Sequence, residues 1–155
     1  MIARARAWLA AFIALFGARP LAAQLPRREL GPVAMVVASE PVFAGLGVSG
    51  AFRLANEVRA VGTATMGGAG SHVVARGDAE LQVVLDPFGK GKARLFAGAG
   101  LSGVTGPDGG GFLLVSAGLE TAPRARRGWS VELGIAGGAR LAIAYRFRSG
   151  SKSRR

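Results

Sequence analysis

The chain has 155 residues and no cysteine, so it has room for one domain of usual size and no disulfide framework or thiolate metal site. Lysine and arginine outnumber aspartate and glutamate by 20 to 9. A basic excess of this size suits anionic lipid headgroups as well as nucleic acid. Aromatic residues are only 7% of the chain and form no ladder with basic residues, so nucleic acid is not expected as a partner.

The first 23 residues have the order of a secretory signal peptide. Its parts are a basic region at Arg4 and Arg6, an apolar run over 7–16, and small residues for cleavage at Ala22 and Ala23. The apolar run is too short to span a membrane. We therefore expect a helical signal peptide over 1–23. The alternative is an amphipathic N-terminal helix that stays attached.

The closing part of the chain predicts a β-hairpin. Over 129–147 apolar residues alternate strictly with small or charged residues, and Gly137-Gly138 supplies a two-residue turn. One face carries Trp129, Val131, Leu133, Ile135, Leu141, Ile143, Tyr145 and Phe147. Period-two alternation in neighbouring segments indicates two half-buried strands with one apolar and one charged face.

Similar strand patterns recur along the chain and are broken by turn residues. The expected strands are 31–39, 42–54, 57–66, 75–86, 93–103, 111–121, 129–136 and 139–148. The first is weak because Val36 and Val37 blur its alternation, and 67–74 is expected to be a loop. About ten residues, tilted near 40°, span the apolar band of an outer membrane, whereas soluble strands usually have about 5 or 6.

These patterns predict an all-β fold. We expect a single closed antiparallel up-and-down β-barrel of about eight strands over 24–148, followed by a basic tail over 149–155. In a membrane barrel the apolar faces would meet lipid and the charged faces would line the lumen. In a soluble barrel or sandwich the apolar faces would point inward.

The polar faces of the expected strands carry a nearly balanced set of charges. These are Arg53, Glu57, Arg59, Arg76, Asp78, Glu80, Arg94, Glu120, Glu132, Arg140, Arg146 and Arg148. A narrow lumen can hold such groups only as ion pairs, and glycines at 45, 47, 98, 100, 118 and 134 would make room for them. A solvated outer face of a soluble sheet would also accommodate mixed charge.

Two segments resemble the strands of small Gram-negative outer-membrane β-barrel proteins, the outer-membrane protein A-like barrel superfamily. The segment 96–101 is similar to their aromatic-x-Gly-x-Gly strand, and 138–147 is similar to their last strand, which ends in an aromatic assembly signal. The resemblance implies a location in the cell outer membrane, contact with outer-membrane lipids, and insertion by the barrel-assembly machinery through the last strand. A monomer is expected.

Motifs that could carry chemistry are sparse. Two stretches, 45–50 and 98–103, match G-x-G-x-x-G, and only the first could precede a helix, over 51–61. Ser71 and His72 could belong to a lipid hydrolase, but adjacent residues on a strand point to opposite faces and no acid lies nearby to orient the imidazole. We expect no catalytic, cofactor-binding or metal-binding residues, no cofactor, and no enzymatic activity.

Basic residues outside the strands gather at the expected periplasmic rim. They are Arg27, Arg28, Lys90, Lys92, Arg124, Arg126, Arg127, Lys152, Arg154 and Arg155, whereas the opposite rim has Glu40 and Asp108. These basic residues could lie among inner-leaflet phosphates or simply be solvated.

The resulting prediction is an outer-membrane barrel with a structural or interaction role and neither a catalytic site nor an open pore. The alternatives are a secreted soluble β-barrel that binds an apolar ligand and an outer-membrane lipid hydrolase.

Overall fold

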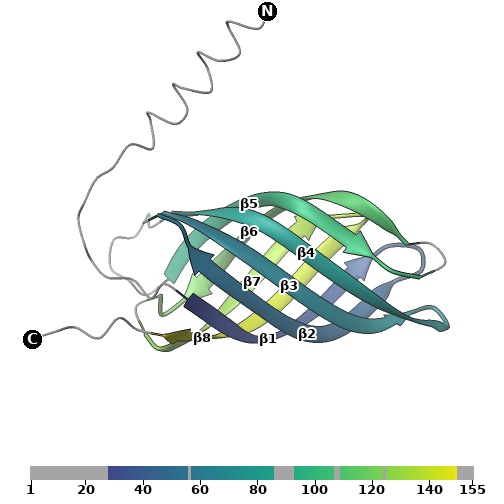
Figure 1. Cartoon of the computed structure of the whole chain (residues 1–155), viewed down its shortest axis with the longest axis horizontal. Coiled ribbons are helices and arrows are strands. Elements are labelled where there is room, and N and C mark those ends of the chain that lie inside the picture. Colours follow the sequence, from purple (N-terminus) through teal and green to yellow (C-terminus); the bar gives the residue numbers. More distant parts are fainter. Residues whose placement is uncertain (1–27, 56, 86–92, 107–108, 124, 150–155) are drawn as a thin grey trace, which may run out of the picture.

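The computed structural model describes residues 28–55, 57–85, 93–106, 109–123 and 125–149. In these residues the chain forms a closed barrel of eight strands, each antiparallel to its neighbours in sequence order, with β8 returning to β1 (Figure 1). The strands are β1 Arg28–Ala38, β2 Phe43–Arg53, β3 Val58–Ala69, β4 His72–Leu85, β5 Ala93–Val104, β6 Gly110–Thr121, β7 Arg127–Ile135 and β8 Ala139–Ser149. The predicted all-β, up-and-down barrel is confirmed.

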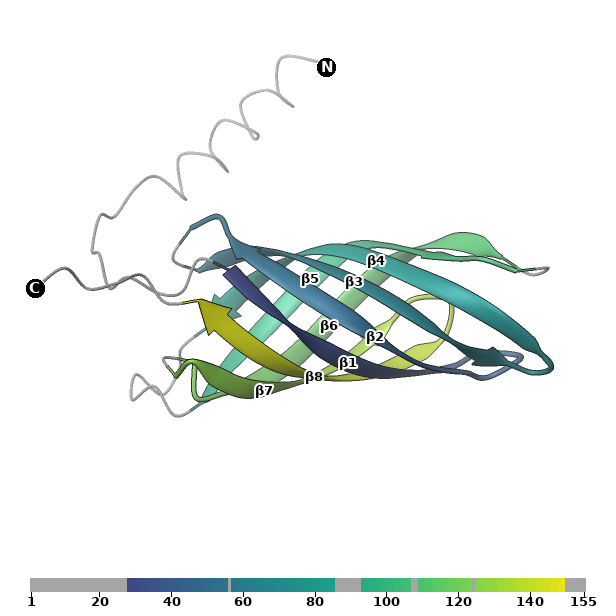
Figure 2. The same cartoon turned by 60° about the horizontal axis from the view of Figure 1, so that its bottom comes forward.

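The barrel has two distinct ends. Figures 1 and 2 show β1 beginning and β8 ending at the same end, which we call the terminal end. The opposite end, where β1 turns into β2 and β7 into β8, is called the loop end. The expected signal peptide over 1–23 lies outside the described residues, as does 150–155 of the expected tail. Among the described residues, no helix is long and apolar enough to cross a membrane.

The first strand is more regular than its sequence suggests. Residues of β1 alternate between buried and exposed along its whole length, with Val36 46% exposed and Val37 fully buried. Two adjacent valines are therefore compatible with alternating burial, because valine suits both the lipid-facing outside and the apolar part of the interior. The strand also begins at Arg28, three residues before the expected start.

The expected loop over 67–74 is wrong. Strand β3 continues to Ala69 and β4 begins at His72, which leaves Gly70 and Ser71 as the connection. Gly70 has a φ of 60°, a conformation that glycine adopts without steric cost. Gly67, the first residue of the expected loop, lies so close to β2 that a Cβ would sit 2.0 Å from the backbone oxygen of Ala44.

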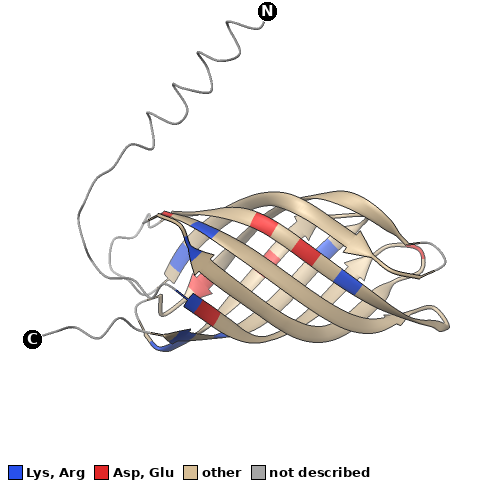
Figure 3. Ribbon diagram, viewed as in Figure 1, with Lys and Arg blue, Asp and Glu red and all other residues tan. Residues whose placement is uncertain are grey.

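The apolar and polar faces are inverted relative to a soluble protein. Leu46 and Leu113, both on the outside, are 70% and 78% exposed, whereas Arg59 and Glu120, on the inside, are 1% and 0% exposed. Figure 3 shows the charged residues concentrated over the terminal end and the middle of the barrel. The alternative of a soluble barrel with an apolar interior is therefore wrong.

Glycines on the inner face make room for larger neighbours, as predicted. A Cβ on Gly118 would sit 2.4 Å from the Phe96 ring, and one on Gly98 would sit 2.8 Å from a carboxylate oxygen of Glu80. Part of the interior is apolar, and its buried members are Val33, Met35, Val37, Phe43, Val74, Ala142 and Ala144. The remaining interior is filled by charged side chains.

Candidate functional site

The charged lumen is the principal candidate site. Eleven of the twelve charged residues assigned to the inner face lie there, in the described strands. Glu57 is the exception, because β3 begins only at Val58 and Glu57 is exposed in the turn before it. Glu29 was missed, and it is 7% exposed on the inner face of β1. Its spacing of two residues from Gly31 and four from Val33, which places all three on one face of a strand, was the signal that could have identified it.

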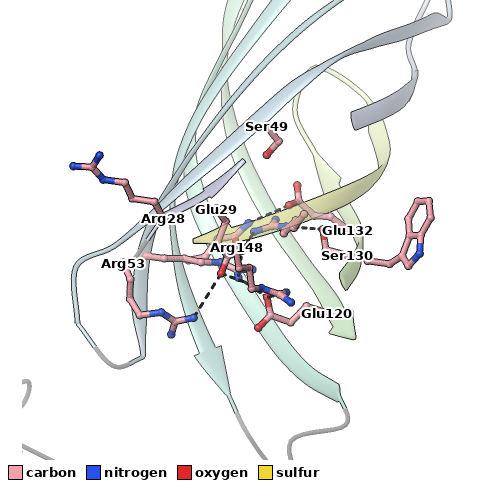
Figure 4. A network of polar contacts seen from close by, with 12 residues as sticks. Arg28, Glu29, Ser49, Arg53, Glu120, Ser130, Glu132 and Arg148 are labelled. Carbon is pink, nitrogen blue, oxygen red and sulfur yellow. Dashed lines mark hydrogen bonds and ion pairs between the residues drawn. The ribbon is translucent and has the colours of Figure 1, made fainter. Parts of the chain in front are cut away.

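Glu29 is the centre of what we call the terminal cluster (Figure 4). Its carboxylate oxygens lie 3.2 Å from Arg146, 3.5 Å from Arg148, 3.8 Å from Arg59 and 3.9 Å from Arg53. Arg146 and Arg148 come from β8, Arg53 from β2 and Arg59 from β3. Glu29 on β1 thus connects both strands that neighbour β1, and also β3. Figure 4 shows Glu29, Arg53 and Arg148 directed toward one another.

Glu120 on β6 completes the terminal cluster from the opposite wall. Its Oε2 lies 2.5 Å from Nη1 of Arg59 and 3.7 Å from Nη2 of Arg148. The guanidinium of Arg59 also lies 4.9 Å from the centre of the Phe96 ring, a cation–π distance. Because Arg59 and Glu120 reach each other across the lumen, their side chains fill its cross-section.

A second group, the middle cluster, lies next to the terminal cluster along the barrel. Asp78 accepts from Arg76 at 3.3 Å and from Arg140 at 3.1 Å. Arg140 also forms an ion pair with Glu132, which accepts a hydrogen bond of 3.0 Å from the amide of Gln82. Strands β4, β7 and β8 are thus joined across the lumen by charge-assisted hydrogen bonds, which are stronger and more directional than neutral ones.

Gln82 joins the two clusters into one network. Its amide oxygen accepts a 2.7 Å hydrogen bond from Nε of Arg59, and its amide nitrogen donates to Glu80. Glu80 in turn accepts a 2.8 Å hydrogen bond from Ser116 on β6. The lumen is therefore crossed by a continuous set of polar contacts, and taking out one charge would leave its partner buried without compensation.

A cavity of about 180 Å³ opens at the loop end. Phe43, Val74 and Phe112 give it apolar walls, and Arg76 lies at its lining toward the middle cluster. His72 lines it as well, and the Nδ1 of His72 is 3.5 Å from the Ser71 hydroxyl. Among the described residues, Ser71 is the hydrogen-bond partner found for His72, and both side chains are exposed. No carboxylate of the described residues contacts His72, so none of them orients the imidazole as a general base, although Glu40 lines the same cavity.

The remaining motifs occupy plain strand positions. The G-x-G-x-x-G stretch 45–50 lies within β2 and 98–103 lies within β5. The segment 51–61, which could have formed a helix, is the end of β2, a turn and the start of β3, as the expected strands 42–54 and 57–66 indicate. Without a helix N-terminus the stretch cannot cradle a phosphate as a nucleotide-binding unit does. In the described part of the chain, no group of three or more His, Asp or Glu residues could hold a metal ion.

The rims differ in charge as predicted, where the structure describes them. Arg28, Arg126 and Arg127 are exposed at the terminal end, and Glu40 is exposed at the loop end. The other rim residues named above, Arg27, Lys90, Lys92, Arg124, Lys152, Arg154, Arg155 and Asp108, lie outside the described residues.

Solved structures share this architecture. The N-terminal β-barrel domain of OprF from Pseudomonas aeruginosa is similar with a TM-score of 0.56 and 15% identity, over 80% of this chain and 100% of that one. Neisserial surface protein A is similar with a TM-score of 0.54 and 12% identity, over 79% of this chain and 96% of that one. No family model and no curated protein matches the sequence. At these identities the likeness shows the fold, that of a small eight-stranded barrel.

Proposed function

We propose that the chain is an outer-membrane β-barrel protein with a structural or interaction role, without a catalytic site or an open pore. The observation that carries the proposal is the inversion of the barrel: large apolar side chains cover its outside and charges fill its inside. In water the cost of this arrangement would be high, because soluble monomers rarely expose contiguous apolar patches above a few hundred Å². In a bilayer the same surface meets hydrocarbon.

The strand lengths support a membrane location. The eight described strands have between 9 and 14 residues. Transmembrane strands need about 9–11 residues when tilted about 45°. Closure of β8 on β1 also leaves no open sheet edge, which is the condition for a β-structure to exist in lipid.

The filled lumen supports a role other than diffusion through a pore. Arg59 and Glu120 meet across the interior, and the contacts of Gln82 extend the network to Glu132. Barrels of eight strands have interiors just wide enough for side chains to fill. Partners therefore have to bind at the lipid-facing wall or at one of the two rims, because the lumen is filled.

Assembly through the last strand is part of the proposal. Strand β8 carries Tyr145 and Phe147 on its outer side, with ring centres 5.0 Å apart, and Trp129 of β7 lies 4.8 Å from Tyr145. An exposed aromatic group on a closing strand fits recognition by the barrel-assembly machinery. We also propose that the folded protein is a monomer surrounded by outer-membrane lipids.

Planar-bilayer recording on the purified, folded chain tests the function directly. We expect no steady ion conductance, because the terminal and middle clusters block the lumen. A stable open channel with porin-like conductance would contradict the proposal. In parallel, the folded protein should fractionate with outer membranes and change its gel mobility on boiling, and recovery in the soluble fraction would contradict the membrane location.

A further inference from the structure

Two arginines lie on the outside of the barrel at the terminal end. Arg28 on β1 and Arg127 on β7 are exposed, and β8 lies between them. Arg28 is paired in register with Ser149, and Arg127 with Phe147. Neighbouring strands are about 4.8 Å apart, and the two pairing positions on β8 are offset by two residues, roughly 7 Å along the strand, so the Cα atoms of the two arginines are about 12 Å apart. Their long side chains can reach one group held between them.

These two arginines are not used by the lumen network. Figure 4 shows Arg28 directed away from Glu29 and Arg148, on the other side of β1. Among the described residues, neither Arg28 nor Arg127 has an ion pair with a carboxylate, whereas the inward arginines Arg146 and Arg148 both contact Glu29. Their charge is therefore available to an anion outside the barrel.

An aromatic group lies next to the two arginines on the same outer surface. Trp129 is 54% exposed and Phe147 is 48% exposed, and Tyr145 packs edge-on against both rings. The guanidinium of Arg127 lies 5.9 Å from the centre of the Phe147 ring, which holds it beside the aromatic surface. Aromatic residues of membrane barrels lie at the level of the headgroups. Arg28 and Arg127, at the ends of their strands, are then level with phosphates.

The loop end offers no equivalent. Its described turns, 39–42, 70–71, 105–106 with 109, and 136–138, contain no lysine or arginine, and Glu40 is exposed there. The charge asymmetry therefore favours anionic headgroups in the leaflet that meets the terminal end.

We propose that Arg28 and Arg127 bind the phosphate of an anionic phospholipid, with Trp129, Tyr145 and Phe147 packing against its glycerol backbone and upper acyl chains. The inference rests on the proposed membrane location and adds a specific partner to it. The phosphodiester accepts hydrogen bonds from both guanidinium groups, and a lipid with a net negative headgroup is preferred over a zwitterionic one because no cationic group competes for the phosphate.

The test uses Trp129 as a reporter at the site. The chain has two tryptophans, Trp8 and Trp129, so Trp8→Phe in the full chain leaves one fluorophore. The folded variant is placed in phosphatidylcholine vesicles that contain a fixed fraction of either brominated phosphatidylglycerol or brominated phosphatidylcholine. Bromine quenches tryptophan at short range, so the difference in quenching measures which lipid is enriched at the site.

We expect phosphatidylglycerol to be enriched about 30-fold over phosphatidylcholine at low salt, the fold-change given by about 1 kcal/mol from each of the two arginines near an anionic surface. Arg28→Gln with Arg127→Gln should bring the two lipids to equal quenching. Inorganic phosphate added to the buffer should leave the enrichment unchanged, because a free anion lacks the acyl chains that pack on the aromatic rings.

A matched reporter at the loop end controls for general surface effects. A chain with Trp8→Phe, Trp129→Phe and Leu113→Trp places the fluorophore on outward-facing Leu113, which is 78% exposed, and should show no preference. Equal quenching of Trp129 by the two brominated lipids would overturn the lipid site while leaving the membrane location intact. Enrichment that survives the double substitution, or that inorganic phosphate abolishes, would also overturn it. Absence of quenching by either lipid would show instead that the barrel is not inserted, and both proposals would fall.

Discussion

Replacing Glu120 by glutamine should destabilise the barrel more than any exposed charge replacement. Glutamine keeps the size of the side chain and one hydrogen-bond acceptor but removes the negative charge. Two guanidinium groups, those of Arg59 and Arg148, then lose a counter-charge at 2.5 and 3.7 Å. Arg148 keeps a carboxylate oxygen of Glu29 at 3.5 Å, whereas the nearest one to Arg59 is then at 3.8 Å, so Arg59 is the group left without a close counter-charge.

The size of the effect follows from burial. The side chains of Glu120 and Arg59 are each 1% exposed, so water cannot screen the charge that remains. Removing one partner of a buried pair costs about 3–5 kcal/mol. Truncating the partner as well, in Arg59→Met with Glu120→Gln, should recover part of this loss, because the uncompensated charge disappears with its partner.

Equilibrium unfolding in urea, followed by Trp129 fluorescence and by gel mobility without boiling, measures the free energy of unfolding of each variant in vesicles. Glu40→Gln is the control, because Glu40 is exposed at the loop end and should change stability by less than about 0.5 kcal/mol. If Glu120→Gln costs no more than Glu40→Gln, the lumen network does not stabilise the fold in the way described. A double variant less stable than Glu120→Gln alone would refute the role of uncompensated charge.

Two further pairs of substitutions test facing and packing. Ile143→Arg, in the middle of β8 on the outer face, should cost about 2–4 kcal/mol in bilayers, whereas Val42→Arg at the loop-end rim should cost about 0–1 kcal/mol; equal costs in urea unfolding would contradict the facing. Gly47→Ala should prevent folding, because its Cβ would sit 1.9 Å from the backbone oxygen of Ala64, whereas Gly62→Ala meets nothing within 4 Å and should fold normally. The fraction that resists unfolding on an unboiled gel distinguishes the two glycines, and equal fractions would show that the close contact is tolerated.

Period-two alternation was enough to predict the strands and their facing, because one face of each strand must be apolar for the barrel to exist in lipid. Alternation could not locate the strand ends. Glu57 has the alternation of an inward-facing residue, but it lies in the turn before β3 and is exposed. Glu29 also has inward alternation, but it lies two residues before the expected start of its strand and was therefore not assigned to the inner face. The expected loop over 67–74 is wrong partly because the close backbone approach that requires a glycine at 67 is invisible in a single sequence.

The pairing of the charges was beyond prediction from the sequence. Glu29 and Arg146 are 117 residues apart and meet because β8 closes on β1 in a particular register. A shift of that register by two residues would preserve every inward and outward assignment and change the ion pairs that Arg146 and Arg148 form with Glu29. The same limit applies to Gln82, a neutral residue whose amide joins the two clusters only because both Arg59 and Glu132 lie within reach.

The central claim, that the barrel is inverted and embedded in lipid, is tested most directly by spin labelling along β8. The sequence contains no cysteine, so a single cysteine at each position from 141 to 147 gives an unambiguous label. In bilayers, labels at outward positions such as Leu141 and Ile143 should collide often with oxygen, which dissolves in hydrocarbon. Labels at inward positions such as Ala142 and Ala144 should be immobile and poorly accessible to oxygen. A period of two with this phase is the predicted result, whereas the opposite phase, or high accessibility of the outward labels to a water-soluble nickel reagent, would contradict the account.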